Sequence, residues 1–442
     1  MPSTAQAVLA SWSFPPWVTS LDLLLALLYL RGWYSLHRTL PSRFTSGRLA
    51  SFVAGIATLQ IALASPIDAF DPFLLTNHML QHMLLMMIVP PLVLLGDPVM
   101  PLLHGLPRWF ARWVAGPILR WQPIVLLGRL LTYPPVALLF VSVAMVGWHL
   151  SAPYELALRS PGWHEVEHAT FLVSSLFFWW PVVQPWPSRA RWNSWMLPIY
   201  LLLADFVNSV VCAFLVFSDR VYYPSYLHVP RLAGISAQND QVAAGMVMWV
   251  IGSIAFLIPA AAITVRLLSP APPRAPRPSH ALQPESPTVS YILLGLALAI
   301  PAAAAGYGLF APERIDIDGD VVRIQQISGP FRISVFTAPD PVEKDDFEVA
   351  VLVQDARTSE AILDSEVELA VEPSGKPSGD LEFVRATREQ SQNKLLHAAS
   401  LDLPDDPVPV LHVVVHQGAD EGQVTFPLQV AASPAASPSR HE

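Results

Sequence analysis

Two histidines four residues apart, His78 and His82, open a long apolar stretch of the chain. Four residues make about one turn of an α-helix, so both imidazoles are expected on one face. Neutral imidazole and thioether groups bind copper or zinc, and thioether favours Cu(I). The stretch therefore predicts a membrane-spanning helix with metal-binding side chains at one end. Four methionines lie at the same end of the stretch: Met79, Met83, Met86 and Met87.

A second histidine pair, His164 and His168, has the same helical spacing and starts another apolar segment. Glu167 lies beside this pair and could orient a ligating imidazole through a hydrogen bond. One more histidine, His149, ends the apolar segment before it. We expect one metal site built from these five residues: His78, His82, His149, His164 and His168.

The segment from His164 to His168 reads HEVEH, which also matches the zinc-protease pattern HExxH. In such a protease Glu165 would act as the general base. The pattern is short, and no motif for a third ligand follows it. A plain pair of metal ligands is therefore the preferred interpretation, with a membrane zinc metalloprotease as an alternative.

Other polar residues lie within later apolar segments. Asp205 falls near the middle of a predicted span, where a carboxyl group costs about 2.5–3.5 kcal/mol. It either joins a polar network between helices or serves an ion pathway, as in a copper transporter. Asp240 and Gln241 open the face of another span that continues through Met248, and these three could border the site.

Composition indicates a polytopic membrane protein joined to an acidic soluble region. The chain has 442 residues, of which 52% are hydrophobic and 14% charged. Residues 1–310 contain 16 arginines, no lysine and 11 acidic residues, whereas residues 311–442 contain 10 basic and 24 acidic residues. The single cysteine, Cys212, excludes a disulfide within the chain. The lipid bilayer is an expected partner, whereas no nucleic-acid partner is expected.

Eight segments are long and apolar enough to span a membrane. Arginine is concentrated in alternate connections, 13 residues against 3, which predicts that the odd-numbered connections are cytoplasmic and both termini periplasmic. This orientation places all five candidate ligands at the periplasmic face. The predicted spans are roughly 18–36, 48–65, 78–98, 130–150, 166–184, 193–217, 241–268 and 290–310.

The region after the seventh span divides into distinct parts. Residues 269–289 form a proline-rich cytoplasmic linker, and residues 290–310 form the eighth span. Segments of alternating apolar and polar residues follow, such as FRISVFTA and PVPVLHVVVHQ, and predict an antiparallel β-sandwich within residues 311–430. Residues 431–442 are expected to be disordered.

Several of these segments together resemble the CtaG family, membrane proteins linked to assembly of caa-type cytochrome c oxidase. The resemblance rests on the third span, the Trp148-His149 pair, the HEVEH cluster, FFWWP at 177–181 and DQxxxGxxMW at 240–249. It covers roughly residues 15–268, which is nearly all of the predicted seven-span membrane domain at residues 1–268. It implies a membrane all-α bundle, and the eighth span and β-domain lie outside it. By resemblance the five histidines correspond to the family's recurrent outer-face histidines.

The sequence thus predicts a non-enzymatic assembly factor of the bacterial inner membrane. It would bind copper at the periplasmic face and deliver it to a maturing cytochrome c oxidase subunit. Besides the protease and the transporter, a haem-binding electron carrier remains an alternative, because histidines are also axial haem ligands.

Overall fold

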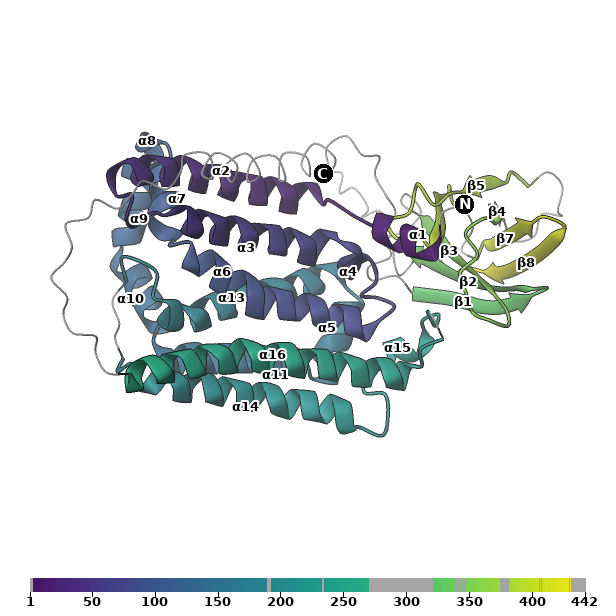
Figure 1. Cartoon of the computed structure of the whole chain (residues 1–442). Helices are drawn as coiled ribbons and strands as arrows, with labels where there is room; N and C mark the ends of the chain where they lie inside the picture. Colours follow the sequence, from purple (N-terminus) through teal and green to yellow (C-terminus); the bar gives the residue numbers. More distant parts are fainter. Residues whose placement is uncertain are drawn as a thin grey trace, which may run out of the picture.

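The computed structural model describes a helical bundle and a separate β-domain at one end of it (Figure 1). Three predicted parts lie outside the described residues: the linker after its first residue, the eighth span and the disordered end. The described residues are 3–188, 192–232, 234–269, 321–338, 342, 347–373, 381–404, 406, 408–428 and 430.

The helical part is dominated by long, roughly parallel helices (Figure 1). The first half contains α1 (Thr4–Ala10), α2 (Pro16–Thr39), α3 (Ser46–Ala64), α4 (Pro66–Ala69), α5 (Leu75–Met83), the π-turn η1 (Leu84–Ile88), α6 (Val89–Leu95) and α7 (Val99–Gly105). Short helices follow: α8 (Arg108–Phe110), η2 (Ala111–Ala115), α9 (Gly116–Arg120) and α10 (Gln122–Leu131). The second half contains α11 (Pro134–Trp148), α12 (Ser151–Leu158), α13 (Pro161–Val183), α14 (Met196–Phe217), α15 (Ser225–His228) and α16 (Ala237–Leu268).

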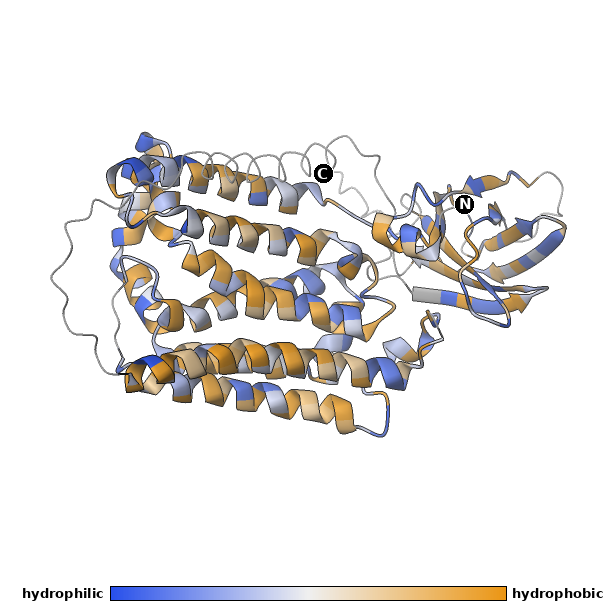
Figure 2. Cartoon of the chain, viewed as in Figure 1, coloured by the Kyte–Doolittle hydropathy of each residue, from blue (hydrophilic) through white to orange (hydrophobic). Residues whose placement is uncertain are grey.

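Five helical segments of the described chain are long and apolar enough to cross a membrane. They become six if α10 and α11 count as one span bent by 73°. Their apolar side chains also cover the outside of the bundle, as on α14, where Phe206, Val210 and Phe214 are exposed (Figure 2). Such a surface fits lipid rather than water. A multi-pass membrane protein is thus confirmed, whereas the predicted number of seven family spans is not.

The predicted span 130–150 starts later than expected. Helix α11 begins at Pro134, and Tyr133 before it has an extended backbone with ψ of 122°. A proline disfavours helical backbone at the preceding residue and is favoured in the first helical turn. The helix is therefore interrupted between Leu131 and Pro134, and the residues before the interruption belong to α10.

The third span is continuous but contains the π-turn η1 immediately before Pro90. Pro90 has no amide hydrogen, so the carbonyl of Met86, four residues earlier, has no partner in the helix. The indole Nε1–H of Trp179 on α13 donates to that carbonyl at 3.0 Å. A neighbouring helix thus restores the hydrogen bond that Pro90 removes.

The other end of the third span is held by Asp97, which has a positive φ of 49°. Its carboxylate forms an ion pair with Arg48 and accepts the backbone N–H of Trp186 at 2.9 Å. Close by, the Tyr29 hydroxyl donates to the Gly96 carbonyl at 2.7 Å. The segment Gly96-Asp97 therefore anchors the span at the end opposite to the histidines.

The β-domain contains two four-stranded antiparallel sheets, with strand orders β1-β2-β3-β6 and β5-β4-β7-β8. Inward-facing residues of the two sheets, such as Val351 and Val413, share one buried cluster. Antiparallel β-structure after the membrane region is thus confirmed. The strands are β1 (Val321–Ser328), β2 (Phe331–Ala338), β3 (Glu348–Asp355), β4 (Glu366–Glu372), β5 (Val384–Ala386), β6 (Leu396–Ser400), β7 (Val410–Gln417) and β8 (Asp420–Pro427).

The first sheet packs against the helical part with its outer face. Ala350 and Leu352 of β3 join a buried cluster with Phe70 and Phe73, which precede α5, and the rings of Phe73 and Phe336 lie 5.6 Å apart. Strand β3 is therefore buried on both faces, which explains its continuous apolar run where alternation was expected. The β-domain consequently touches the segment that leads into the third span.

Candidate metal centre

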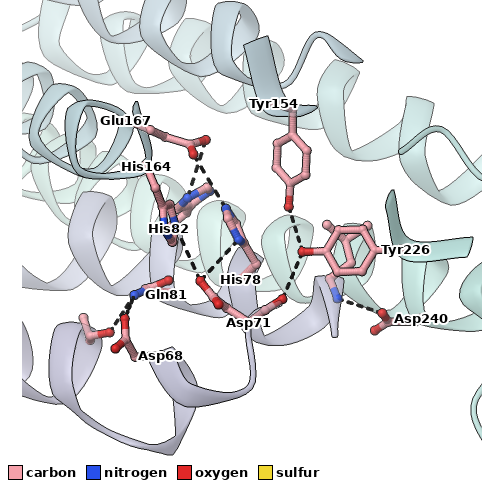
Figure 3. Close-up of polar contacts among 12 residues, drawn as sticks. Asp68, Asp71, His78, Gln81, His82, Tyr154, His164, Glu167, Tyr226 and Asp240 are labelled. Carbon is pink, nitrogen blue, oxygen red and sulfur yellow. Dashed lines mark hydrogen bonds and ion pairs between the residues drawn. The ribbon is translucent and has the colours of Figure 1, made fainter. Parts of the chain in front are cut away.

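The candidate site lies where α5, α13 and the end of α11 meet. Figure 3 shows His78, His82 and His164 beside the carboxylates of Asp71 and Glu167. His78 and His82 lie on α5, whereas His164 and His168 lie on α13. The helical spacing of each pair turns both rings toward the neighbouring helix, as expected. His149 follows the last residue of α11, where its Nδ1 contacts the Met145 carbonyl at 2.7 Å.

The structure brings the five predicted histidines together. The ring centroids of His78 and His82 are 4.3 Å apart, and those of His164 and His168 are 4.2 Å apart. Between the helices, His78 lies 5.1 Å from His164 and His82 lies 5.5 Å from His168. His149 is at the edge of the cluster, 6.2 Å from His82.

Two carboxylates complete the cluster, one expected and one missed (Figure 3). Glu167 reaches both α5 histidines, with Oε2 at 3.8 Å from His78 Nε2 and Oε1 at 3.7 Å from His82 Nε2. Asp71, in the loop before α5, has its Oδ2 at 3.5 Å from His78 Nδ1 and 3.4 Å from His164 Nε2. Asp71 was missed because it lies in the turn before α5 and not on the helix, so helical spacing does not connect it with His78.

The cluster is buried, yet several of its polar atoms lack hydrogen bonds. His78, His82 and Glu167 have no exposed surface. Among the described residues, neither ring nitrogen of His78 or His82 and neither carboxylate oxygen of Glu167 has a hydrogen-bond partner. Buried polar atoms without partners are costly and rare. Such atoms aimed at one another indicate a place for a cation.

The distances within the cluster suit metal ligands better than hydrogen bonds. The nitrogen–oxygen distances of 3.4–3.8 Å exceed the normal hydrogen-bond range. Two ligands that lie about 2.0–2.2 Å from one tetrahedral ion are about 3.3–3.6 Å apart. Two groups have ligand atoms within 4.8 Å of one another, namely His78, His82 and His168, and Asp71, His78 and His164.

The methionines of α5 and η1 occupy a different environment. Met79, Met83 and Met86 are fully buried in the main hydrophobic cluster of the bundle, as is Met248 of α16. This position is typical of packing residues, since methionine fills irregular gaps in cores. The ligand atoms that the structure gathers are nitrogen and oxygen.

Asp240 and Gln241 support the site without joining it. The Asp240 carboxylate accepts the backbone N–H groups of Leu75 and Thr76 at 2.7 and 3.1 Å, so it caps the start of α5 from another helix. Gln241 accepts the Tyr222 N–H at 2.7 Å and donates to the Leu215 carbonyl at 3.2 Å. Asp240 and Gln241, which were expected to border the site, thus hold backbone groups of α5 and of the loop after α14.

Asp205 lies on α14 and accepts a hydrogen bond of 2.9 Å from the Ser253 hydroxyl of α16. This contact joins two long helices that pack closely, because the backbone at Gly252 lies against the Asn208 side chain. The geometry matches a polar link between helices, one of the two roles considered for Asp205.

Three tyrosines contact the site through their rings and hydroxyl groups. The Tyr154 ring lies 5.0 Å from that of His78, and its hydroxyl is 3.2 Å from that of Tyr226. Tyr226 donates to the Asp71 carbonyl at 3.0 Å, and Tyr223 donates to the His149 carbonyl at 3.0 Å. Burial raises the pKa of Tyr154 and Tyr226 well above the normal range, so both remain neutral hydroxyl donors.

A cavity of about 570 Å³ lies between α2, α3 and α13, beside the histidine cluster. Its walls are mainly apolar, with Trp17, Leu21 and Leu59 among them. Asp22, His164 and His168 lie at its polar positions.

Comparison with known proteins agrees with this architecture. Residues 27–269 match the model of the family described as cytochrome c oxidase caa3 assembly factor. The chain is 25% identical over 260 residues to the uncharacterized protein Mb0105 of Mycobacterium bovis. The aligned region makes up 56% of this chain and 38% of that protein. It is 24% identical over 245 residues to the uncharacterized protein ML1998 of Mycobacterium leprae, covering 54% and 36%.

The chain therefore spans less than two fifths of the length of these curated relatives. No solved structure matches it. The family match covers more than half of the chain and includes every helix that contributes a ligand candidate. The chain belongs to the family of cytochrome c oxidase caa3 assembly factors.

Proposed function

We propose that this chain binds copper at the histidine cluster and delivers it to a maturing cytochrome c oxidase subunit. The observation that carries the proposal is the convergence of five histidines and two carboxylates in a buried cluster, in which the ring nitrogens of His78 and His82 have no hydrogen-bond partner among the described residues. Imidazole nitrogens are good copper ligands. Copper, once bound, would supply the cation that these buried atoms face.

The arginine distribution supports an inner-membrane position with the cluster and both termini at the periplasmic side. We further propose that the two sheets form a sandwich outside the membrane and that this domain contacts the oxidase subunit. Ligands drawn from three helices and a loop can separate by small helix movements, which suits release of an ion to a client.

The protease alternative gains little from the geometry. Glu165, which would be its general base, is exposed, whereas Glu167 is buried beside the α5 histidines. In a zinc protease the glutamate of HExxH must face the metal-bound water. A role without catalysis therefore fits better.

The test compares the full-length protein with the His78→Ala/His82→Ala double variant. The matched control is His104→Ala, because His104 lies on α7, outside the cluster, and is exposed. We expect copper in the purified protein and in the control, and loss of copper in the double variant by elemental analysis. In cells the double variant should lose oxidase activity while its amount in the membrane stays unchanged.

The proposal is overturned if copper-supplemented wild-type protein contains no copper, or if the double variant retains it. Zinc at one ion per chain, together with a proteolytic activity that a Glu165→Gln variant loses, would establish the protease instead. A Soret band in the purified protein would establish the haem carrier.

A further inference from the structure

The His78 ring lies between two carboxylates, one at each of its nitrogens (Figure 3). Its Nδ1 is 3.5 Å from Asp71 Oδ2, and its Nε2 is 3.8 Å from Glu167 Oε2. The ring has no exposed surface. A buried imidazole that faces an acidic oxygen on both sides offers two separate places for a cation.

Each side of the ring has its own further ligands. On the Nδ1 side, Asp71 Oδ2 also lies 3.4 Å from His164 Nε2. On the Nε2 side, Glu167 Oε1 lies 3.7 Å from His82 Nε2, and His168 has a ligand atom within 4.8 Å of those of His78 and His82. His78 is the member common to both sets.

We propose that the cluster holds two copper ions, one at each nitrogen of His78. This inference rests on the proposed copper binding and deepens it. The first position consists of Asp71, His78 and His164. The second position consists of His78, His82, His168 and Glu167.

The two positions differ in chemistry and in surroundings. The first has one oxygen and two nitrogens, and its Asp71 belongs to the segment that the β-domain covers. The second has three nitrogens and a carboxylate and lies between α5 and α13. Occupying both positions uses both nitrogens of His78, so the ring becomes an imidazolate and its last proton is released to solvent.

The experiment loads the metal-free full-length protein with excess Cu²⁺, removes unbound ions, and measures copper per chain by elemental analysis. Electron paramagnetic resonance of the same samples reports coupling between the ions. We expect two ions per chain in the wild type, with an integrated resonance well below the copper present, because two Cu²⁺ ions bridged by one imidazolate are magnetically coupled.

Two variants remove the first position, Asp71→Asn and His164→Gln, and each should leave one ion per chain with the full resonance of an isolated Cu²⁺. Glu167→Gln should weaken the second position. The controls are Asp68→Asn, on the short helix α4 just before that loop and hydrogen-bonded to Gln81, and Glu165→Gln, on the same helix as Glu167 but exposed. Both controls should keep two coupled ions.

The outcomes separate this inference from the function on which it rests. One ion per chain in the wild type, with its full resonance, overturns the two-position arrangement and leaves copper binding intact. No copper in the wild type overturns both. Two coupled ions in both Asp71→Asn and His164→Gln also overturn the arrangement, because the first position would then not need its own ligands.

Discussion

The carboxylate of Asp240 on α16 caps helix α5, accepting the backbone N–H of Leu75 at 2.7 Å. Replacing Asp240 with alanine should lower stability by about 1–3 kcal/mol, because it leaves a buried amide without a partner. It should also weaken copper binding, since His78 lies three residues after Leu75 on the same helix. Thermal unfolding and copper titration of the purified variant measure both effects. Asp240→Asn, which keeps one acceptor oxygen, should lose less, and equal losses in the two variants would argue against the capping role.

The bond from Trp179 to the Met86 carbonyl predicts a coupling with Pro90. Trp179→Phe should destabilise the protein by about 1–3 kcal/mol, because the buried carbonyl loses its donor. In a Pro90→Ala background the alanine amide can serve that carbonyl, so the same substitution should cost less. A double-mutant cycle of unfolding free energies tests this expectation. Additive effects would show that the two residues act independently.

His397 makes the stability of the β-domain depend on pH. Burial between the sheets, with a smaller effect from the positive charge of Arg388, lowers its pKa from 6.5 to about 4. Between these values the unfolded chain binds a proton that the folded domain does not, so stability falls as pH drops from 6.5 to 4. The shift corresponds to about 3 kcal/mol.

Hydrogen exchange of β3 and β6 amides in the full-length protein, corrected for intrinsic rates, measures this dependence. Protection should be constant above pH 7 and decline toward pH 4. A His397→Leu variant should lose this part of the decline. If wild type and variant decline in parallel, His397 is not its source.

Asn393 links the β-domain to the loop that contains Asp71. Its Nδ2 donates to the Ala69 carbonyl at 3.0 Å, and its Oδ1 accepts the Leu395 N–H at 3.0 Å. Asn393→Ala should raise hydrogen exchange in residues 66–74 and weaken copper binding severalfold. Arg385→Ala, which breaks only an exposed ion pair with Glu366, is the control and should change neither. Unchanged exchange in Asn393→Ala would separate the β-domain from the site.

The histidine cluster was accessible from the sequence because it depends on local spacing. His78 and His82, and likewise His164 and His168, share a helix face in any α-helix, and the apolar residues around them indicate a span. The arginine pattern placed all five histidines at one face, and by resemblance they correspond to the family's recurrent outer-face histidines. The match to residues 27–269 confirms the family.

The parts that depend on contacts between distant segments were not accessible. Asp71 approaches His78 from a turn outside the helix, and Asp240 accepts a hydrogen bond from a backbone group 165 positions away, so no periodicity encodes either contact. Asp240 and Gln241 were expected to border the site, but their hydrogen bonds to distant backbone groups were not foreseen. The span predicted at 130–150 failed at its start because the break before Pro134 was read as part of a continuous apolar segment.

The π-turn before Pro90 has a consequence for the two ends of the third span. A π-turn adds one residue to a helical turn, which rotates everything beyond it by about 100° relative to an unbroken α-helix. The face that presents His78 and His82 is therefore out of phase with the face that leads to Asp97. Deleting a single residue within Leu84–Ile88 would bring the two faces into phase. Either the histidines or Asp97 would then lose their contacts with neighbouring residues. The spacing between ligand and anchor is thus as much a property of the site as the ligands themselves.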